Sequence, residues 1–256
     1  MKVFCKFWQI FYAIDICTFR SYNIYDYCSY LGVLFMETLK YKELEYIIRY
    51  PVDFSKDKKY PLVIYLHGAG GRGRDIESLK KYHGFFAETA DVLRDSVSVL
   101  PQCYANSWFD IFEQLEDYAE MVASLPFVDS QRVYLLGASM GGYGAWQLAM
   151  SRPELFAAVA PICGGGMYWN AARLKNTPVW AFHGDSDQTV LPEESRKMVD
   201  GVNKNGGDAR LTIYENTEHN AWSPTFVNAE FWKWMFSQKN HYAPTKNEYS
   251  DVKKYG

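Results

Sequence analysis

The stretch that decides the fold is residues 133–141, which read VYLLGASMG. Its first four residues form a continuous apolar run, the pattern of a strand buried on both faces. Residues 143–150 have helical character, so the segment reads strand, tight turn, helix. The two glycines let strand and helix approach closely, and Ser139 then projects from the end of the strand. A tight Ser/Gly turn without reactivity is the alternative, but this context predicts that Ser139 is a nucleophile.

Short apolar runs alternate with helical stretches on both sides of this segment. The alternation is typical of a mostly parallel sheet covered by helices on both faces, with functional groups at the carboxyl ends of the strands. The sequence therefore predicts an α/β fold with a mostly parallel central sheet. The expected strands are residues 46–50, 61–66, 97–100, 133–136, 157–160, 179–182 and 211–214, and the expected helices are residues 85–93, 110–125, 143–150, 193–203 and 226–236.

Three parts of the chain differ in composition. Residues 36–240 carry the alternating pattern and are expected to form one α/β domain, followed by a polar tail over residues 241–256. Residues 1–35 hold 11 aromatic residues and three of the five cysteines, which marks them as an atypical extension. They resemble translated AT-rich DNA upstream of a start at Met36; a membrane-surface anchor and a lid are the rival interpretations. We expect residues 1–35 to be dispensable for fold and activity.

Charge and cysteine content exclude several classes of protein. The 27 Lys and Arg residues nearly balance the 30 Asp and Glu residues, and the net charge of −3 argues against a nucleic-acid binder. No run of about 18 apolar residues is present, so stable membrane insertion is not expected. The cysteine spacing indicates no metal site, and nothing in the sequence implies a metal or organic cofactor. Free thiols favour a cytoplasmic location; secretion is the alternative. The cysteines are residues 5, 17, 28, 103 and 163.

A serine nucleophile needs a general base, and three histidines follow Ser139 in the chain. Hydrolases with this turn order their catalytic residues as serine, acid, histidine. His241 lies in the polar tail, and His183 precedes the candidate acids. His219 follows the last expected strand, so the sequence predicts that His219 is the base, with an inert loop histidine as the alternative.

The acid must hold the imidazole of His219 in the correct tautomer and stabilise its charged form. Asp185 and Asp187 both come directly after the expected strand at 179–182. Position alone does not separate the two residues. The aspartate that is not the acid is expected to cap a turn or the following helix.

Two backbone N–H groups are needed to stabilise the oxyanion of a tetrahedral intermediate. The first is expected from Met140, the residue after the nucleophile. The second is expected from the early loop at residues 66–71, LHGAGG, with Ala69 as the first choice and Gly70 next to it. A phosphate cradle is the alternative, but the loop lacks the GK[ST] ending of a P-loop. His67 is expected to be a structural turn residue.

At these residues the chain resembles the α/β-hydrolase superfamily. More narrowly, it resembles bacterial esterases often labelled predicted peptidases, which are related to polyhydroxybutyrate depolymerases and to feruloyl and acetylxylan esterases. The resemblance covers residues 60 to about 237 and implies an α/β-hydrolase fold with Ser139 as nucleophile, Asp187 as acid and His219 as base. Its HGxxDxxV pattern at residues 183–190 favours Asp187 over Asp185. The stretches that carry it are residues 66–73, 101–103, 107–108, 137–144, 161–165, 182–190 and 219–222.

These observations favour a serine carboxylesterase whose partner is a small-molecule or oligosaccharide ester, such as an acetyl or feruloyl ester of plant polysaccharide. Trp108 and Trp222 offer flat faces for a sugar or phenolic ring, and core packing is the alternative for both. A serine peptidase or aminoacyl hydrolase on the same triad is the second hypothesis. A non-catalytic hydrolase-fold binding protein is the third, although such proteins usually lose the serine or the histidine.

Overall fold

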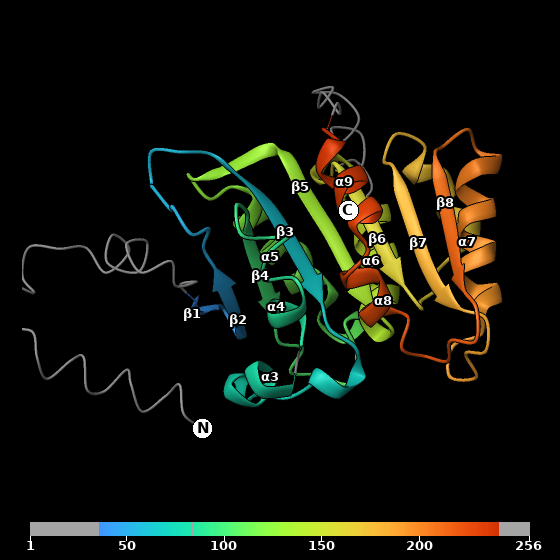
Figure 1. Cartoon of the computed structure of the whole chain (residues 1–256), viewed down its shortest axis with the longest axis horizontal. Helices are drawn as coiled ribbons and strands as arrows, with labels where there is room; N and C mark the ends of the chain where they lie inside the picture. Colours follow the sequence, from blue (N-terminus) through green and yellow to red (C-terminus); the bar gives the residue numbers. More distant parts are fainter. Residues whose placement is uncertain (1–35, 83, 241–256) are drawn as a thin grey trace, which may run out of the picture.

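The computed structural model describes residues 36–82 and 84–240. The expected extension at residues 1–35 and the polar tail at 241–256 lie outside the described residues. Eight strands form one sheet in the order β1-β2-β4-β3-β5-β6-β7-β8 (Figure 1). The strands are β1 (Met36–Tyr41), β2 (Leu44–Arg49), β3 (Tyr60–Leu66), β4 (Val97–Pro101), β5 (Val128–Ala138), β6 (Ala158–Ile162), β7 (Val179–Gly184) and β8 (Ala209–Tyr214).

The sheet is mixed but mostly parallel. β2 pairs antiparallel with β1 and β4, whereas β3 to β8 are joined by parallel pairings. The predicted α/β fold with a mostly parallel sheet is therefore confirmed. Because the six strands β3 to β8 run the same way, the loops that leave their carboxyl ends meet at one edge of the sheet.

Helices cover both faces of the sheet (Figure 1). One apolar core joins alternate strand residues, such as Leu62 and Leu135, to α5, α6 and α7. The residues between them, such as Val63 and Leu136, pack against α3, α4, α8 and α9 in a second core. The strands are buried on both sides, which explains their continuous apolar runs. The helices are α3 (Ile76–Tyr82), α4 (Phe85–Glu88), α5 (Phe112–Ala123), α6 (Met140–Ser151), α7 (Pro192–Lys204), α8 (Trp222–Phe226) and α9 (Ala229–Ser237).

The helix expected over residues 85–93 is much shorter in the structure. Only α4, Phe85–Glu88, is helical, and the Thr89 hydroxyl donates a 2.6 Å hydrogen bond to the Phe85 carbonyl at its end. A threonine that bonds the backbone in this way competes with helix continuation. The helix α3, which the sequence analysis did not predict, precedes it. Its first turn is capped by Asp75, whose carboxylate accepts from the backbone N–H groups of Glu77 and Ser78.

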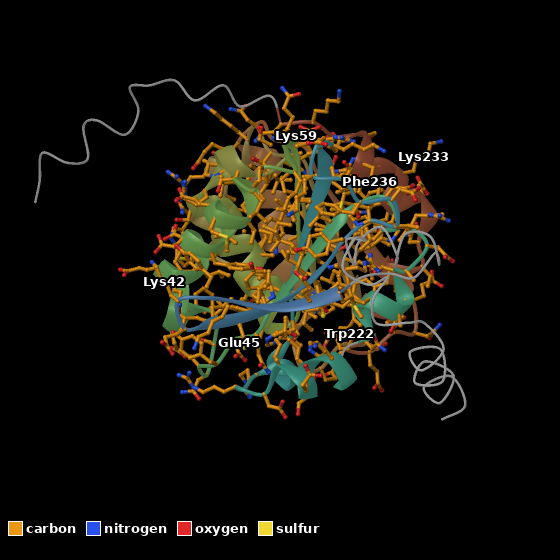
Figure 2. The ribbon with its side chains drawn as sticks, turned by 90° about the vertical axis from the view of Figure 1, so that its left-hand side faces the viewer. Lys42, Glu45, Lys59, Trp222, Lys233 and Phe236 are labelled. Carbon is orange, nitrogen blue, oxygen red and sulfur yellow. The ribbon has the colours of Figure 1, made fainter. Side chains whose placement is uncertain are left out.

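Most charged side chains of the described residues lie at the periphery of the molecule, whereas Arg49 and Asp187 are buried. Figure 2 looks onto the β1–β2 edge of the sheet and shows Lys42, Lys59 and Lys233 pointing outward. Among residues 36–82 and 84–240, no helix combines the length and the apolar character that crossing a membrane requires.

Candidate active site

The turn between β5 and α6 places Ser139 at the carboxyl edge of the sheet. Ser139 has φ 56° and ψ −120°, a conformation that is strained for a residue with a side chain. A Cβ at Gly137 would lie 2.0 Å from the Gly141 carbonyl oxygen, and a Cβ at Gly141 would lie 1.9 Å from that of Leu66. The two glycines of the motif are therefore required by close approach of the backbone, as the sequence analysis expected.

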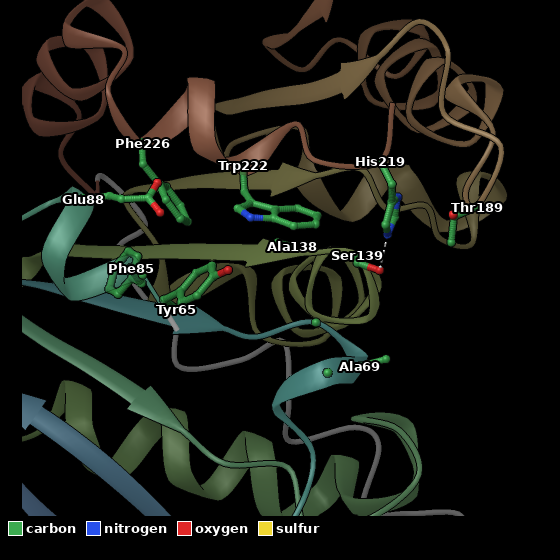
Figure 3. Close-up of a pocket in the computed structure, with 13 residues that line it drawn as sticks. Tyr65, Ala69, Phe85, Glu88, Ala138, Ser139, Thr189, His219, Trp222 and Phe226 are labelled. Carbon is green, nitrogen blue, oxygen red and sulfur yellow. Dashed lines mark hydrogen bonds between the residues drawn. The ribbon is translucent and has the colours of Figure 1, made fainter. Parts of the chain in front are cut away.

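Three loops bring Ser139, His219 and Asp187 together (Figure 3). The Ser139 Oγ lies 2.8 Å from His219 Nε2, and His219 Nδ1 lies 2.7 Å from Asp187 Oδ2. These contacts join three residues that are up to 80 positions apart in the chain. The hydrogen-bonded series runs from a buried carboxylate to a serine that lines a cavity. This is the geometry in which histidine takes a proton from serine while the carboxylate orients the ring.

The carboxylate of Asp187 is held by the backbone as well as by His219. Its Oδ1 accepts from the N–H groups of Thr189 at 2.8 Å and Val190 at 3.0 Å. Burial raises the pKa of Asp187, but the bonds from His219 and from these amides outweigh it and hold the pKa below its usual value. The group is therefore ionised at neutral pH and can stabilise a positive charge on His219.

Asp185 occupies a different position. It is exposed, and its Oδ1 accepts from the Ser186 hydroxyl at 2.8 Å and from the Thr217 amide at 3.2 Å. The bond from the Thr217 amide joins the loop after β7 to the loop after β8. Asp187 contacts His219 and Asp185 does not, so the structure distinguishes two aspartates that position in the sequence could not.

The glycine-rich loop after β3 lies against the serine. Gly68, Ala69 and Gly70 line the same cavity as Ser139, and Met140 begins α6 directly after it. A Cβ at Gly68 would lie 3.4 Å from the Ser139 Cβ, which shows how close the loop approaches. Ala69 therefore lines the same cavity as Ser139, and Met140 follows Ser139 in the chain; their role as oxyanion donors stays a prediction.

Trp108 does not contact the cavity, so the interpretation of this residue as substrate-binding is wrong. Its side chain is fully buried, and its indole N–H donates to the His67 carbonyl at 3.1 Å. His67 is also buried; its Nδ1 lies 2.6 Å from the Gly68 carbonyl, and its Nε2 accepts from the Cys103 amide. Both residues support the glycine-rich loop from behind. The core-packing alternative therefore holds for Trp108, and His67 has the structural role expected of it.

Trp222 does line the cavity, with its ring 5.6 Å from that of His219. The cavity has a volume of about 540 Å³ and extends from the serine past Trp222 to a group of aromatic side chains (Figure 3). The sequence analysis missed most of its wall because the residues come from separate segments with no shared motif. The lining consists of Tyr65, Gly68, Ala69, Gly70, Gly84, Phe85, Glu88, Ala138, Ser139, Thr189, His219, Trp222 and Phe226.

A second set of serine, histidine and aspartate shares Asp187. The His183 Nδ1 lies 2.7 Å from Ser195 Oγ, and its Nε2 lies 3.3 Å from Asp187 Oδ2 and 2.9 Å from the Val190 carbonyl. Ser195 Oγ also lies 2.9 Å from the Gly164 carbonyl. Because His183 and Ser195 are fully buried, a substrate cannot reach this hydroxyl. The set is a structural network beneath the cavity.

Cys163, Asp187 and His219 form a group of described residues with ligand atoms close enough to hold a metal ion. The Cys163 thiol and the ligand atoms of Asp187 and His219 all lie within 4.8 Å of one another. Burial raises the pKa of the Cys163 thiol to about 12. Asp187 and His219 are bonded to each other at 2.7 Å.

Comparison with known proteins agrees with this architecture. The sequence matches the dienelactone hydrolase family over residues 52–230, more than half of the chain. The chain belongs to the dienelactone hydrolase family. This membership confirms the resemblance to the α/β-hydrolase superfamily.

Individual relatives differ in the activity that their names state. A solved structure of a thermostable esterase is 34% identical, covers 80% of this chain and 63% of its own, and has a TM-score of 0.70. Feruloyl esterase D of Neurospora crassa is 24% identical and is matched over 65% of this chain and 61% of its own length. Dipeptidyl-peptidase 5 of Porphyromonas gingivalis is 22% identical over 66% of this chain, and only 32% of its own length is matched. This chain therefore spans less than two thirds of these relatives.

Proposed function

We propose that the protein is a serine carboxylesterase that acts through Ser139, His219 and Asp187. The observation that carries the proposal is the hydrogen-bonded series Asp187–His219–Ser139, which ends at a cavity of about 540 Å³. In the shared network, only Ser139 is both bonded to a histidine and in contact with that cavity. A reactive serine at the mouth of a largely apolar cavity suits an ester that carries an apolar group.

The geometry supports the following steps. His219 takes the proton of Ser139 as the hydroxyl attacks the ester carbonyl, and Asp187 stabilises the imidazolium. The amides of Met140 and Ala69 then donate to the oxyanion. His219 gives its proton to the leaving alcohol, which leaves an acyl group on Ser139. Water activated by His219 attacks this acyl-enzyme, and the acid is released.

The finer substrate assignment rests on the relatives. Feruloyl and acetyl esters of plant polysaccharide are the first candidates, since feruloyl esterases are among the curated matches. The partly exposed ring of Trp222 in the cavity fits a flat acyl group better than an acetyl group alone.

Peptide or aminoacyl hydrolysis is the second candidate function. The observation that favours it is the match to a dipeptidyl-peptidase. That relative is about three times as long as the part that matches, so this chain aligns with only a third of it. The ester proposal therefore takes precedence.

One assay separates the two functions. A p-nitrophenyl ester of a short carboxylic acid and an aminoacyl p-nitroanilide are offered to the same preparation, with S139A as the control. We expect the wild type to hydrolyse the ester with far higher kcat/KM, and S139A to hydrolyse neither. Preference for the anilide would move the assignment to a peptidase, and hydrolysis by S139A would remove the role of Ser139.

A further inference from the structure

The far end of the cavity carries a carboxylate that the proposed mechanism does not use. Glu88 ends α4, and its side chain extends beside Phe226 at the opposite end from Ser139 and His219 (Figure 3). Glu88 is exposed to solvent. Among the described residues, none forms an ion pair with Glu88. The carboxylate is therefore available to a ligand that fills the cavity.

The wall next to Glu88 is made of aromatic rings that pack on one another. The Tyr65 and Phe85 rings are stacked with centroids 4.3 Å apart. The Phe226 ring meets both edge-on, at 5.5 Å from Tyr65 and 5.3 Å from Phe85. Because each ring is held by the other two, this wall is preformed. The three rings are fully buried and cover one another's faces, so the wall is rigid backing. Trp222 is partly exposed and is the ring that a ligand can contact between Ser139 and the carboxylate.

The helix that carries Glu88 is fixed to the sheet by a buried cation. The Arg49 guanidinium, fully buried in β2, donates to the Phe86 carbonyl at 3.1 Å and to the Ser98 hydroxyl at 3.1 Å. The carboxylate itself lies over Gly84, where a Cβ would fall 2.4 Å from Glu88 Oε1. The short helix is thus anchored, and the acid has a defined place at the end of the wall.

The described residues that line the cavity include one acidic side chain, Glu88. None of the 13 described residues that line it is a lysine or an arginine. Glu88 stands at one end, and the ionised Asp187 lies behind His219 at the other. Aromatic faces together with a carboxylate attract a cation and repel an anion. An uncharged group gains only the apolar contact.

We propose that Glu88, together with Trp222, selects esters whose remote end carries a positively charged nitrogen. The proposal rests on the proposed esterase function and deepens it, since it names the chemical class of the group that fills the cavity. Recognition combines cation–π contact with Trp222, the partly exposed ring of the cavity, and charge attraction to Glu88. The reacting carbonyl meanwhile sits at Ser139.

The test uses pairs of esters that differ only in charge. One series carries the charge on the acyl side: p-nitrophenyl ω-(trimethylammonio)alkanoates against the isosteric esters that end in a tert-butyl group. A second series carries it on the alcohol side: ω-(trimethylammonio)alkyl acetates against their tert-butyl isosteres. The spacer length is varied in both. The measurement is kcat/KM for full-length wild type, E88Q and E77Q.

E77Q is the matched control because Glu77 is an exposed acid on the neighbouring helix α3 and is paired with Lys80 at 2.6 Å. At one spacer length, in one of the two series, wild type is expected to prefer the cation on the order of fivefold to twentyfold, as expected for one partly solvated charge with an aromatic face. E88Q should reduce the preference to about unity by lowering kcat/KM for the charged ester. E77Q should keep it.

Two results would overturn the proposal. One is equal use of charged and neutral esters at every spacer length in both series, and the other is a cation preference that E88Q retains. Added salt gives a further check, because a preference based on charge falls as ionic strength rises. Failure of the esterase function is distinct, since the neutral esters would then not be cleaved at all.

Discussion

Two sets of serine, histidine and aspartate meet at one carboxylate in this protein, and only one of them contacts the cavity. Ser139, His219 and Asp187 line up at 2.8 and 2.7 Å and end at the cavity. Ser195 and His183 approach the same Asp187 with similar distances but are fully buried. Residue types and hydrogen bonds are nearly equal in the two sets. What differs is access.

The comparison also shows what the buried set does. The Val190 carbonyl accepts from His183, and the Val190 amide donates to Asp187, so the two networks share one loop. The buried set therefore holds the loop that carries the acid. Variants that distinguish rate from stability should separate the two sets.

The nucleophile should give the largest difference. S139A is expected to lower kcat by on the order of 10⁴ or more, because only binding and the oxyanion hole remain. S195A should keep kcat within about threefold of wild type, since this hydroxyl does not meet substrate. Steady-state hydrolysis of a p-nitrophenyl ester measures both. Comparable losses from the two variants would contradict the distinction.

The acid should give the next largest effect. D187N is expected to reduce kcat by about 10⁴, because an amide in place of the carboxylate favours the wrong tautomer of His219. D185N should be mild, since Asp185 contacts Ser186 and Thr217 instead of His219. The pair is compared by kcat at neutral pH. Equal effects of D185N and D187N would remove Asp187 from its proposed role.

Stability should reverse the ranking of the two serines. S195A removes a hydroxyl that lies between His183 and the Gly164 carbonyl, and it leaves buried polar atoms without a partner. We expect a loss of about 1–3 kcal/mol in the free energy of unfolding. S139A should leave that free energy nearly unchanged or raise it, since its backbone strain remains and its hydroxyl is accessible. Urea unfolding of the two variants decides the matter.

The two tryptophans should separate in the same way, with smaller effects. W222A is expected to raise KM for esters with an aromatic acyl group about fivefold more than for p-nitrophenyl acetate, because a ring face in the cavity is lost. W108F should lower the melting temperature and kcat together without changing substrate preference, since Trp108 supports the glycine-rich loop. A changed preference in W108F would place that ring at the site after all.

The pH dependence of stability should report the buried histidine. Burial lowers the pKa of His183 in the folded state below its usual value of about 6.5. The unfolded chain then binds more protons than the folded one, so stability is present above about pH 6.5 and is lost as pH falls below it. Thermal unfolding between pH 8 and 5 measures this. H183Q should show a weaker dependence, and an unchanged slope would exclude His183 as its source.

Local sequence determined seven of the eight strands in the described part of the chain, all but β1, together with the turn at Ser139 and the candidate triad. Apolar runs predict buried strands because both faces are covered, and the glycines at 137 and 141 reflect backbone contact that no side chain permits. Order along the chain singled out His219, and the HGxxDxxV pattern favoured Asp187. Each of these features lies within a short stretch of sequence, such as an apolar run or the HGxxDxxV pattern, or depends on the order of residues along the chain.

Tertiary structure alone decided the rest. Trp108 and Trp222 look equivalent in sequence, yet one lies in the core and the other in the cavity, because burial depends on which elements pack around each ring. The cavity wall joins Tyr65 of β3, Phe85 and Glu88 of α4, and Phe226 of α8. No periodicity links these segments. Their proximity follows from the packing of helices on the sheet, and that packing decides which chemical groups a substrate meets.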